Sequence, residues 1–329
     1  MPVLSGRDPA AVRQAAERLA AGELVAFATE TVYGLGARAD DDTAVAAIYA
    51  AKGRPAGHPL IVHLADAATA AHFAADLSPA ARRLMAAFWP GPMTLIVPRR
   101  PGVATAAAGG QASVGLRLPA HPVALALLRE AADLGVPGVA APSANRFGRV
   151  SPTRAAHVVD EFGPALTVLN GGDCDVGIES TIVDCTREHP ALLRPGQLGR
   201  ERIEAVLGQV LAAPDAASPR ASGTLASHYA PAAPVTLFDA AQPPWAHAAA
   251  AQALARQGRG LGVYSRAVPP TEAGCLHRPM PAQAAAVAHE LFAVLRDFDT
   301  AGVAAIWVER PPPGPAWDGV RDRLQRAAA

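Results

Sequence analysis

The chain has 329 residues, half of them hydrophobic, which is enough for two domains of ordinary size. Its 29 Lys and Arg residues balance its 29 Asp and Glu residues, so there is no overall basic field of the kind that marks nucleic-acid binders, although a local patch stays open. The longest apolar runs are rich in alanine and far shorter than the ~18 strongly apolar residues of a membrane helix, so no membrane span is expected.

The cysteines and the N-terminus predict a cytosolic protein. Cys174, Cys185 and Cys275 are far apart, odd in number and without a CxxC pair, as expected for reduced, buried thiols. The first residues, MPVLSGRDPA, lack a basic region followed by an apolar core, so no signal peptide is expected.

Helices and strands alternate through the first 210 residues. Helices are indicated by apolar residues at helical spacing, by caps such as Asp41 and Ser151, and by glycines after the last turn. Several short strands are joined by hairpin-length links, which predicts a mixed sheet. The predicted helices cover 9–21, 41–53, 79–88, 121–131, 151–163 and 200–211, and the predicted strands cover 23–29, 59–64, 93–97, 113–119, 138–145, 165–170, 180–185 and 191–196.

The stretch AAPDAASPRASG (212–223) is small, polar and proline-bearing, which is typical of a linker. Beyond it, strands are predicted near 235–238, 260–265 and 304–310, with helices near 245–256 and 282–298. That alternation predicts a second, compact α/β domain. We therefore expect a larger α/β domain over 1–210, a linker over 211–233 and a smaller α/β domain over 234–329.

The segment GLGARA (34–39) fits the dinucleotide pattern G-x-G-x-x-G/A but lacks its context. The residues TETVY separate it from the preceding strand, and Asp66 follows Gly36 by about 30 residues instead of the usual ~20. A turn made by glycines is the plainer interpretation. The sequence also has no G-x-x-x-x-G-K-[ST], no HExxH, no paired metal-ligand Cys/His spacing and no G-x-S-x-G.

The segment KGRPAGHPLIVH (52–63) brings Lys52, Arg54, His58 and His63 together. Cations at a helix end commonly compensate the helix dipole. Here they stand in a loop stiffened by glycine and proline, which suits a polyphosphate because Arg can grip phosphate oxygens with two donors. His63 lies in an apolar strand, where a core histidine with satisfied hydrogen bonds is the alternative.

Other polar side chains stand at strand ends. Arg117 lies between two leucines, and a buried guanidinium needs an anion, either a structural Asp or Glu or a substrate carboxylate. Polar loops at strand ends in one domain predict a ligand cleft, and the cations predict a ligand with more than one anionic group. The remaining members of this set are Ser143, Asn145, Ser151, Thr153, Glu179, Ser180, Thr181 and Arg194.

The motifs TETVYGLG, KGRP…PLIVH, WPGPMTLIV, VGLRLP, PSAN…SPT, STIVD and LLRPG occur in this order over about residues 8–210. Together they resemble the YrdC/Sua5 family, the threonylcarbamoyl-AMP synthases. The later SHYAP (227–231), followed by a small α/β domain, looks like the longer Sua5 form, so the resemblance covers nearly the whole chain.

The resemblance implies a YrdC fold, a twisted mixed sheet around a large concave cleft, with a smaller Rossmann-like C-terminal domain. It implies a nucleotidyltransferase that joins L-threonine, bicarbonate or CO2 and ATP into threonylcarbamoyl-adenylate and releases pyrophosphate. The product would pass to the machinery that makes N6-threonylcarbamoyladenosine at position 37 of tRNA, with weak or no direct tRNA binding by this chain.

The resemblance also implies roles for residues. Lys52 and Arg54 would be catalytic, with Mg2+ held mainly by the ATP phosphates and no protein metal site. Segment TETVYGLG would form the bottom of the amino-acid pocket, and its glycines would let the backbone approach the ligand. The L-threonine pocket would use Thr31, His63, Arg117, Ala141 through its backbone, Ser180 and Thr181. ATP would contact Lys52, Arg54, His58, Ser113, Ser143, Asn145, Ser151 and Arg194, and Tyr229 of the linker would close over it as part of a lid.

This sequence departs from the usual family pattern at Ala28, where proline is common, and at His58, where asparagine is common. Its linker, SGTLASHYAP, lacks the lysine of the usual SPGMKYRHYAP. Other functions stay open: a module that binds double-stranded RNA or tRNA through a basic cleft, an NAD-dependent oxidoreductase through GLGARA, or a carbamoyltransferase subunit. The last would need acylphosphatase and zinc-finger segments, which this sequence lacks.

Overall fold

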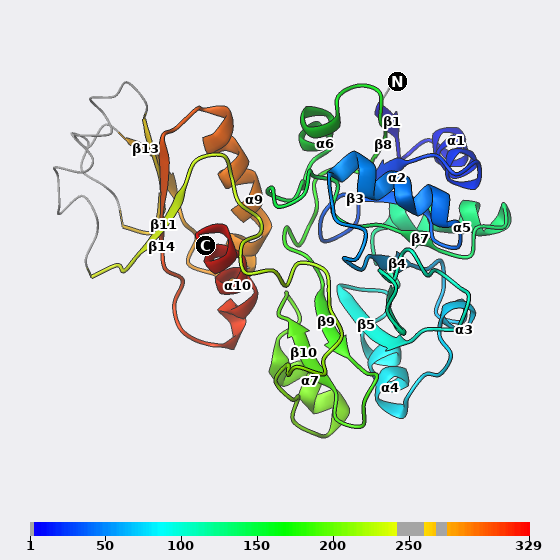
Figure 1. The fold of residues 1–329 in the computed structure, drawn as a ribbon. Coiled ribbons are helices and arrows are strands. Elements are labelled where there is room, and N and C mark those ends of the chain that lie inside the picture. The colour runs from blue at the N-terminus through cyan, green and yellow to red at the C-terminus, as the bar shows by residue number, and fades with distance from the viewer. Residues whose placement is uncertain (1–2, 242–259, 268–274) are drawn as a thin grey trace. The chain divides into compact units, whose positions relative to one another are not determined.

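The computed structural model describes residues 3–241, 260–267 and 275–329. The chain divides into two compact units, one of residues 1–147 and 151–224, the other of residues 148–150 and 225–329 (Figure 1). The linker segment up to residue 224 therefore belongs to the first unit, and Tyr229 belongs to the second. The helix predicted near 245–256 lies outside the described residues.

The first unit is built on a ten-stranded mixed sheet, which confirms the predicted fold class. Neighbouring strands are parallel in the pairs β1–β8, β8–β2, β4–β6 and β5–β9, and antiparallel elsewhere. Its strands, in spatial order, are β1 (Val3–Ser5), β8 (Thr167–Asn170), β2 (Val25–Phe27), β3 (Gly34–Arg38), β7 (Val139–Ala140), β4 (Ile61–His63), β6 (Ser113–Arg117), β5 (Met93–Pro98), β9 (Thr181–Asp184) and β10 (Ala191–Arg194).

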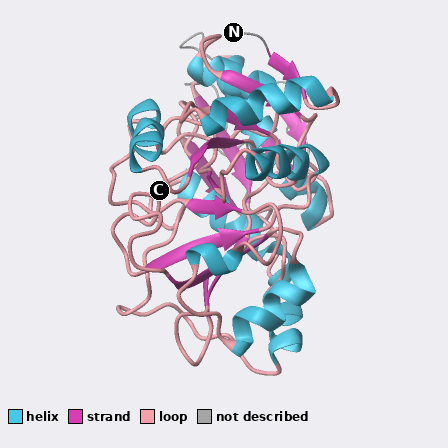
Figure 2. Cartoon of the chain, turned by 90° about the vertical axis from the view of Figure 1, so that its right-hand side faces the viewer, coloured by secondary structure: helices cyan, strands magenta, loops and turns pink. Residues whose placement is uncertain are grey.

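Helices pack against this sheet through two separate apolar clusters. In one cluster, α1 (Pro9–Ala20) and α5 (Pro122–Asp133) lie together on Val25 and Phe27. The other cluster takes the alternate residues of the same strands, such as Ala26 and Leu35, and so lies on the opposite face. It receives the helices α2 (Asp42–Lys52), α4 (Pro79–Phe88), α6 (Ala155–Phe162) and α7 (Arg200–Leu207) and the short α3 (Ala70–Phe73), several of which Figure 2 shows around the magenta strands.

One part of the sheet is covered differently. Residues Ile61, Ile96, Ile182 and Leu193 form an apolar floor on β4, β5, β9 and β10, and Ala212 and Ala221 of the linker segment pack on it. In β6, Val114 and Leu116 point into the helix-covered core, so strand alternation places Ser113, Gly115 and Arg117 on the other face. The fold thus puts predicted site residues under a stretch of irregular chain.

The second unit is the small α/β domain that the sequence predicts. Its sheet has the order β11 (Val235–Phe238), β14 (Ala305–Glu309), β12 (Leu261–Ser265), β13 (Cys275–Pro279), with all strands parallel. Among the residues of this unit that the structure describes, the helices are α9 (Ala284–Thr300), the 3-10 turn η3 (Pro315–Trp317) and α10 (Asp318–Ala327). The sequence analysis missed β13, because this partly exposed edge strand has no apolar run, and α10, because its sequence is highly charged.

Two helix predictions are wrong at their ends. The helix predicted from Ser151 begins at Ala155, and Ser151 does not cap it. The backbone before it is extended and already paired, since Tyr33 N donates to Pro152 O at 2.9 Å and Cys174 N donates to Thr153 O at 3.0 Å. The helix predicted to Leu211 ends at Leu207, where Gly208 takes a left-handed conformation with φ of 69°.

The glycines of TETVYGLG lie in a strand, contrary to the turn considered above. β3 runs antiparallel to β2, with Gly36 opposite Val25. A Cβ on Gly36 would stand 2.8 Å from Cε1 of Phe27 and 2.9 Å from Cγ1 of Val139. The missing side chain at Gly36 therefore makes room for a core phenylalanine rather than for a ligand.

Gly36→Ala should lower the free energy of unfolding by about 1–3 kcal/mol, because the added methyl group overpacks the core. Chemical denaturation of the purified chain measures this. In a Phe27→Leu background, which removes the nearest ring atom, the cost of Gly36→Ala should be smaller. An equal cost in both backgrounds would contradict the assigned contact.

Candidate active site

Thr31, His63 and Arg117, predicted for the amino-acid pocket, meet at the ends of β4 and β6. His63 and Arg117 are paired in the parallel register of these strands. Arg117 donates from Nη1 to the Thr31 hydroxyl at 2.8 Å and from Nε to the Gly91 carbonyl at 3.3 Å. All three side chains are buried, so the pocket holds one fixed guanidinium beside a hydroxyl and an imidazole.

The anion beside Arg117 is Glu30. Its Oε1 lies 2.6 Å from Arg117 Nη2, with exposures of 4% for the Arg117 side chain and 8% for the Glu30 side chain. Burial acts most strongly and raises the pKa of Glu30, but the Arg117 charge, hydrogen bonding to Arg117 and the nearby backbone of Glu30 and Ala120 together hold that pKa below its usual range. The structural carboxylate that the sequence left open is therefore present, and it lies inside the predicted pocket.

His63 is a buried neutral imidazole. Burial, helped by the neighbouring Arg117 charge, lowers the pKa of His63 to about 3. Its ring meets Phe27 edge-on, with centroids 6.1 Å apart. Among the described residues its Nδ1 makes no hydrogen bond of ordinary geometry, although the backbone of Ile61 and Val139 lies near enough to oppose the lowering of the His63 pKa. The core histidine expected as the alternative would have both ring nitrogens satisfied, so a polar group in the pocket can still bond to this one.

His63 should make folding depend on pH below about 6.5. Its pKa is depressed in the folded state, so its stabilising contribution is complete above the unfolded value and is lost as pH falls towards about 3. Between these two pKa values, the ionisation of His63 should change the free energy of unfolding by about 1.4 kcal/mol for each pH unit. Denaturation at pH 4 to 7 should show that His63→Gln removes this slope, whereas the same change at the exposed His189 keeps it.

The predicted nucleotide residues gather around Lys52 at the end of α2. Lys52 Nζ donates to the Ser143 carbonyl at 2.6 Å and, at shorter range, to the Asn145 carbonyl. The side chain is 3% exposed, and burial together with the nearby Arg54 charge lowers its pKa well below the ordinary value. This ammonium lies against two carbonyls, and no carboxylate in the described part of the chain forms an ion pair with it. An anionic ligand would stabilise its positive charge.

Arg54 and Arg194 are joined through the linker segment. Arg54 donates to the Pro59 carbonyl at 3.0 Å and reaches the Ser222 hydroxyl at 3.5 Å. Arg194 donates from Nη1 to the Ser222 carbonyl at 2.8 Å. The same Arg194 guanidinium donates to the Ser180 carbonyl at 3.1 Å and 2.9 Å, so it connects the nucleotide set to the threonine set.

The remaining predicted residues fall around these groups. Ser113 and Ser222 line one small cavity over the apolar floor. His58 packs edge-on against Phe147, and partial burial and Arg54 lower its pKa. Ser151 donates to Glu179, Ser180 contacts Thr94 at 2.7 Å, Thr181 donates to the Leu198 carbonyl at 3.0 Å, and the Ala141 amide donates to the Ile61 carbonyl at 2.9 Å.

Tyr229 belongs to the second unit. Its ring stacks on Phe292 with centroids 5.4 Å apart, and the Arg323 guanidinium lies 5.3 Å from the ring centre. Tyr229 has a left-handed backbone, with φ of 64°, which is uncommon for a residue other than glycine. Its predicted contact with ATP stays a prediction.

The residues that the structure describes include no group of three or more His, Cys, Asp or Glu side chains placed to hold a metal ion. Within those same ranges, no helix is both long and apolar enough to cross a membrane. All three cysteines are free thiols, and burial raises the pKa of each.

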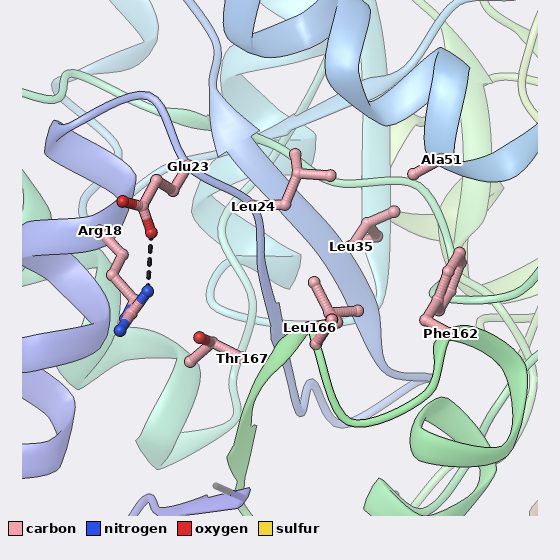
Figure 3. A pocket seen from close by; sticks show the side chains of 9 residues that line it. Arg18, Glu23, Leu24, Leu35, Ala51, Phe162, Leu166 and Thr167 are labelled. Carbon is pink, nitrogen blue, oxygen red and sulfur yellow. Dashed lines mark hydrogen bonds and ion pairs between the residues drawn. The ribbon is translucent and has the colours of Figure 1, made fainter. Parts of the chain in front are cut away.

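A separate hollow of about 330 Å³ lies elsewhere in the first unit (Figure 3). It is largely apolar, with the Arg18–Glu23 ion pair of 2.7 Å at one side, and none of the predicted site residues lines it. Its lining residues are Arg18, Glu23, Leu24, Leu35, Ala51, Phe162, Ala165, Leu166 and Thr167.

Sequence reasoning missed two participants, Glu30 and Ser222. Glu30 could have been suspected, because it is the carboxylate inside TETVYGLG. Lys52 was predicted, and it also stands out as the single lysine of the chain. Ser222 gave no signal, because a serine in a linker has many neutral explanations.

Comparisons with known proteins identify the family. Residues 17–196 match the family described as "Telomere recombination", which groups Sua5, YciO and YrdC, and residues 198–329 match "Threonylcarbamoyl-AMP synthase, C-terminal domain". The threonylcarbamoyl-AMP synthase of Bacillus subtilis is 39% identical, over 99% of this chain and 94% of that protein. The Pyrococcus abyssi enzyme of that name is 43% identical, over 69% of this chain and 68% of its own.

A solved structure shows the same architecture. The crystal structure of P. abyssi Sua5 complexed with L-threonine matches with a TM-score of 0.87 and 35% identity, over 98% of this chain and 95% of that one. The resemblance drawn from the sequence motifs is confirmed. From its N-terminal sheet to its C-terminal domain, this chain belongs to the Sua5/YrdC family.

Proposed function

We propose that this chain is a threonylcarbamoyl-AMP synthase, a nucleotidyltransferase that condenses L-threonine, bicarbonate or CO2 and ATP. The observation that carries the proposal is the placement of Arg117, a buried cation fixed beside Thr31 and His63, in the same unit as a second set of cations that includes Lys52, Arg54 and Arg194. The names of the Bacillus and Pyrococcus relatives support it. So does L-threonine in the matching Sua5 crystal structure.

The chemistry needs positioning more than covalent help. The threonine ammonium first releases one proton. The free amine then bonds to the carbon of CO2 and loses a second proton, which gives a carbamate. A carbamate oxygen then bonds to the α-phosphorus of ATP while the bond to the bridging oxygen breaks, so pyrophosphate leaves. Arg117 would hold the threonine carboxylate. Lys52, Arg54 and Arg194 would neutralise the negative charge of the ATP phosphates during the displacement.

Other parts of the proposal concern partners. Mg2+ would be held mainly by the ATP phosphates. The product would serve threonylcarbamoylation of adenosine 37 in tRNA, a step assigned to other proteins. We also propose a cytosolic location and a domain division into residues 1–210, a lid over 211–233 and a domain over 234–329. In support, Ser222 already contacts Arg54 and Arg194.

Pyrophosphate release from ATP by the purified chain tests the function. We expect release only when both L-threonine and bicarbonate are present. Release with neither would point to a plain nucleotide hydrolase. Absence of release from a folded chain with Mg2+ present would contradict the synthase, and a salt-dependent affinity for tRNA would then favour an RNA-binding module.

A further inference from the structure

The Glu30–Arg117 pair is a costly feature for a protein interior. Two charges lie 2.6 Å apart with almost no exposure, and removing two ions from water often costs more than their attraction returns. Orientation of Arg117 does not require Glu30, because Thr31 and the Gly91 carbonyl already hold two of its nitrogens. A buried carboxylate beside a cation that we assign to substrate binding suggests that the carboxylate also contacts the ligand.

Glu30 also retains hydrogen-bonding capacity. Oε1 forms the ion pair, and the backbone of Glu30 and Ala120 lies near enough to help lower the pKa of the carboxyl group, but within the described residues neither carboxylate oxygen accepts a hydrogen bond of ordinary geometry. An ionised carboxylate offers about four acceptor positions. The neighbouring Thr29 hydroxyl is directed elsewhere, to the Val32 carbonyl at 2.6 Å. A ligand with several hydrogen-bond donors could therefore form hydrogen bonds to the carboxylate oxygens of Glu30.

We propose that Glu30 and Arg117 together recognise an α-amino acid as its zwitterion, with Arg117 bound to the carboxylate and Glu30 to the α-ammonium. The inference rests on the proposed function. The two charged groups of an α-amino acid are attached to one carbon, and the two protein charges are 2.6 Å apart, so a single small ligand can reach both. An ammonium group has three donors, which suits the free acceptor positions of Glu30.

Charge balance gives the pair its selectivity. The pair has no net charge, and neither does a zwitterion, so the complex buries four charges that sum to zero. A hydroxy acid of the same shape would bring one negative charge next to Glu30 with nothing to compensate it. Glu30 would therefore be a specificity-determining residue that excludes carboxylic acids without an amine.

The test compares L-threonine with 2,3-dihydroxybutanoate, in which a hydroxyl replaces the amine, by calorimetry at pH 7. For the unaltered chain we expect L-threonine to bind at least tenfold more tightly. In Glu30→Gln, the affinity for L-threonine should fall by about tenfold to hundredfold, whereas the hydroxy acid should bind equally well or better. The ratio of the two affinities should therefore become much smaller. Glu30→Asp, which keeps the charge, should restore part of the ratio, and the exposed Glu23→Gln should leave it unchanged.

Several outcomes are distinguishable. Equal weakening of both ligands in Glu30→Gln would show a merely structural role and overturn the inference. Equal affinity of the unaltered chain for both ligands would overturn it without any variant, which covers the case in which Glu30→Gln does not fold. An unaltered chain that binds ATP but neither ligand would instead contradict the proposed function.

Discussion

Arg117→Met should abolish L-threonine-dependent pyrophosphate release and raise the dissociation constant for L-threonine by at least about a hundredfold. The substitution keeps the length of the side chain but removes the cation that we assign to the substrate carboxylate, and a hydrogen-bonded charge pair of this kind is worth about 2–5 kcal/mol. Calorimetry with L-threonine and with ATP separates the two sites, because ATP binding should change little.

Arg117→Met should also destabilise the fold, by about 3–5 kcal/mol, because it leaves Glu30 buried without a counter-charge. The double variant Glu30→Gln/Arg117→Met removes both charges and should recover most of that stability. It should not recover L-threonine binding. The pair of variants thus distinguishes a chain that fails because it is unstable from one that fails because its ligand has lost a partner.

The opposite result for the double variant would be informative. If stability and L-threonine binding returned together, the guanidinium would be a structural element, and the substrate carboxylate would need another donor. Thr31 and His63 are then the nearest candidates, because both are buried at the same strand ends.

The sequence predicted most of the fold, for physical reasons that vary between segments, whereas the roles of the predicted site residues stay predictions. Asp41 and Gly53 bound α2 as expected, since a capping carboxylate and a left-handed glycine leave few alternatives. Ser151 misled the analysis because a serine before a proline resembles a cap, whereas tertiary pairing of the 152–153 backbone decides where α6 begins. The helix propensity of the local sequence cannot predict such tertiary backbone hydrogen bonds.

Contacts between distant segments were beyond sequence reasoning. Glu30 and Arg117 are 87 positions apart, and Ser222 lies 168 positions from Arg54. Residue type indicated that Arg117 needs an anion, but it could not choose between a protein carboxylate and a substrate. The structure shows a protein carboxylate, Glu30, beside Arg117. We propose that the same guanidinium also binds the carboxylate of the substrate.

Lys52→Met should reduce pyrophosphate release by about a hundredfold to a thousandfold while leaving L-threonine binding intact. The reason is the loss of one fixed positive group where phosphate charge develops, an effect of that size in other enzymes. Lys52→Arg should not restore activity, because a planar guanidinium cannot fit where Nζ lies 2.6 Å from the Ser143 carbonyl in a side chain that is 3% exposed.

The chain's single lysine allows this site to be observed directly. A protein labelled with carbon-13 lysine should give one side-chain signal in the NMR spectrum. Its titration midpoint should lie well below that of an ordinary lysine, because burial and Arg54 disfavour the charged form. Added ATP should move the midpoint upward, since phosphate charge favours the ammonium. A lysine signal that ATP leaves unchanged would place the nucleotide away from Lys52, and the cations around Arg194 would then have to bind the phosphates without it.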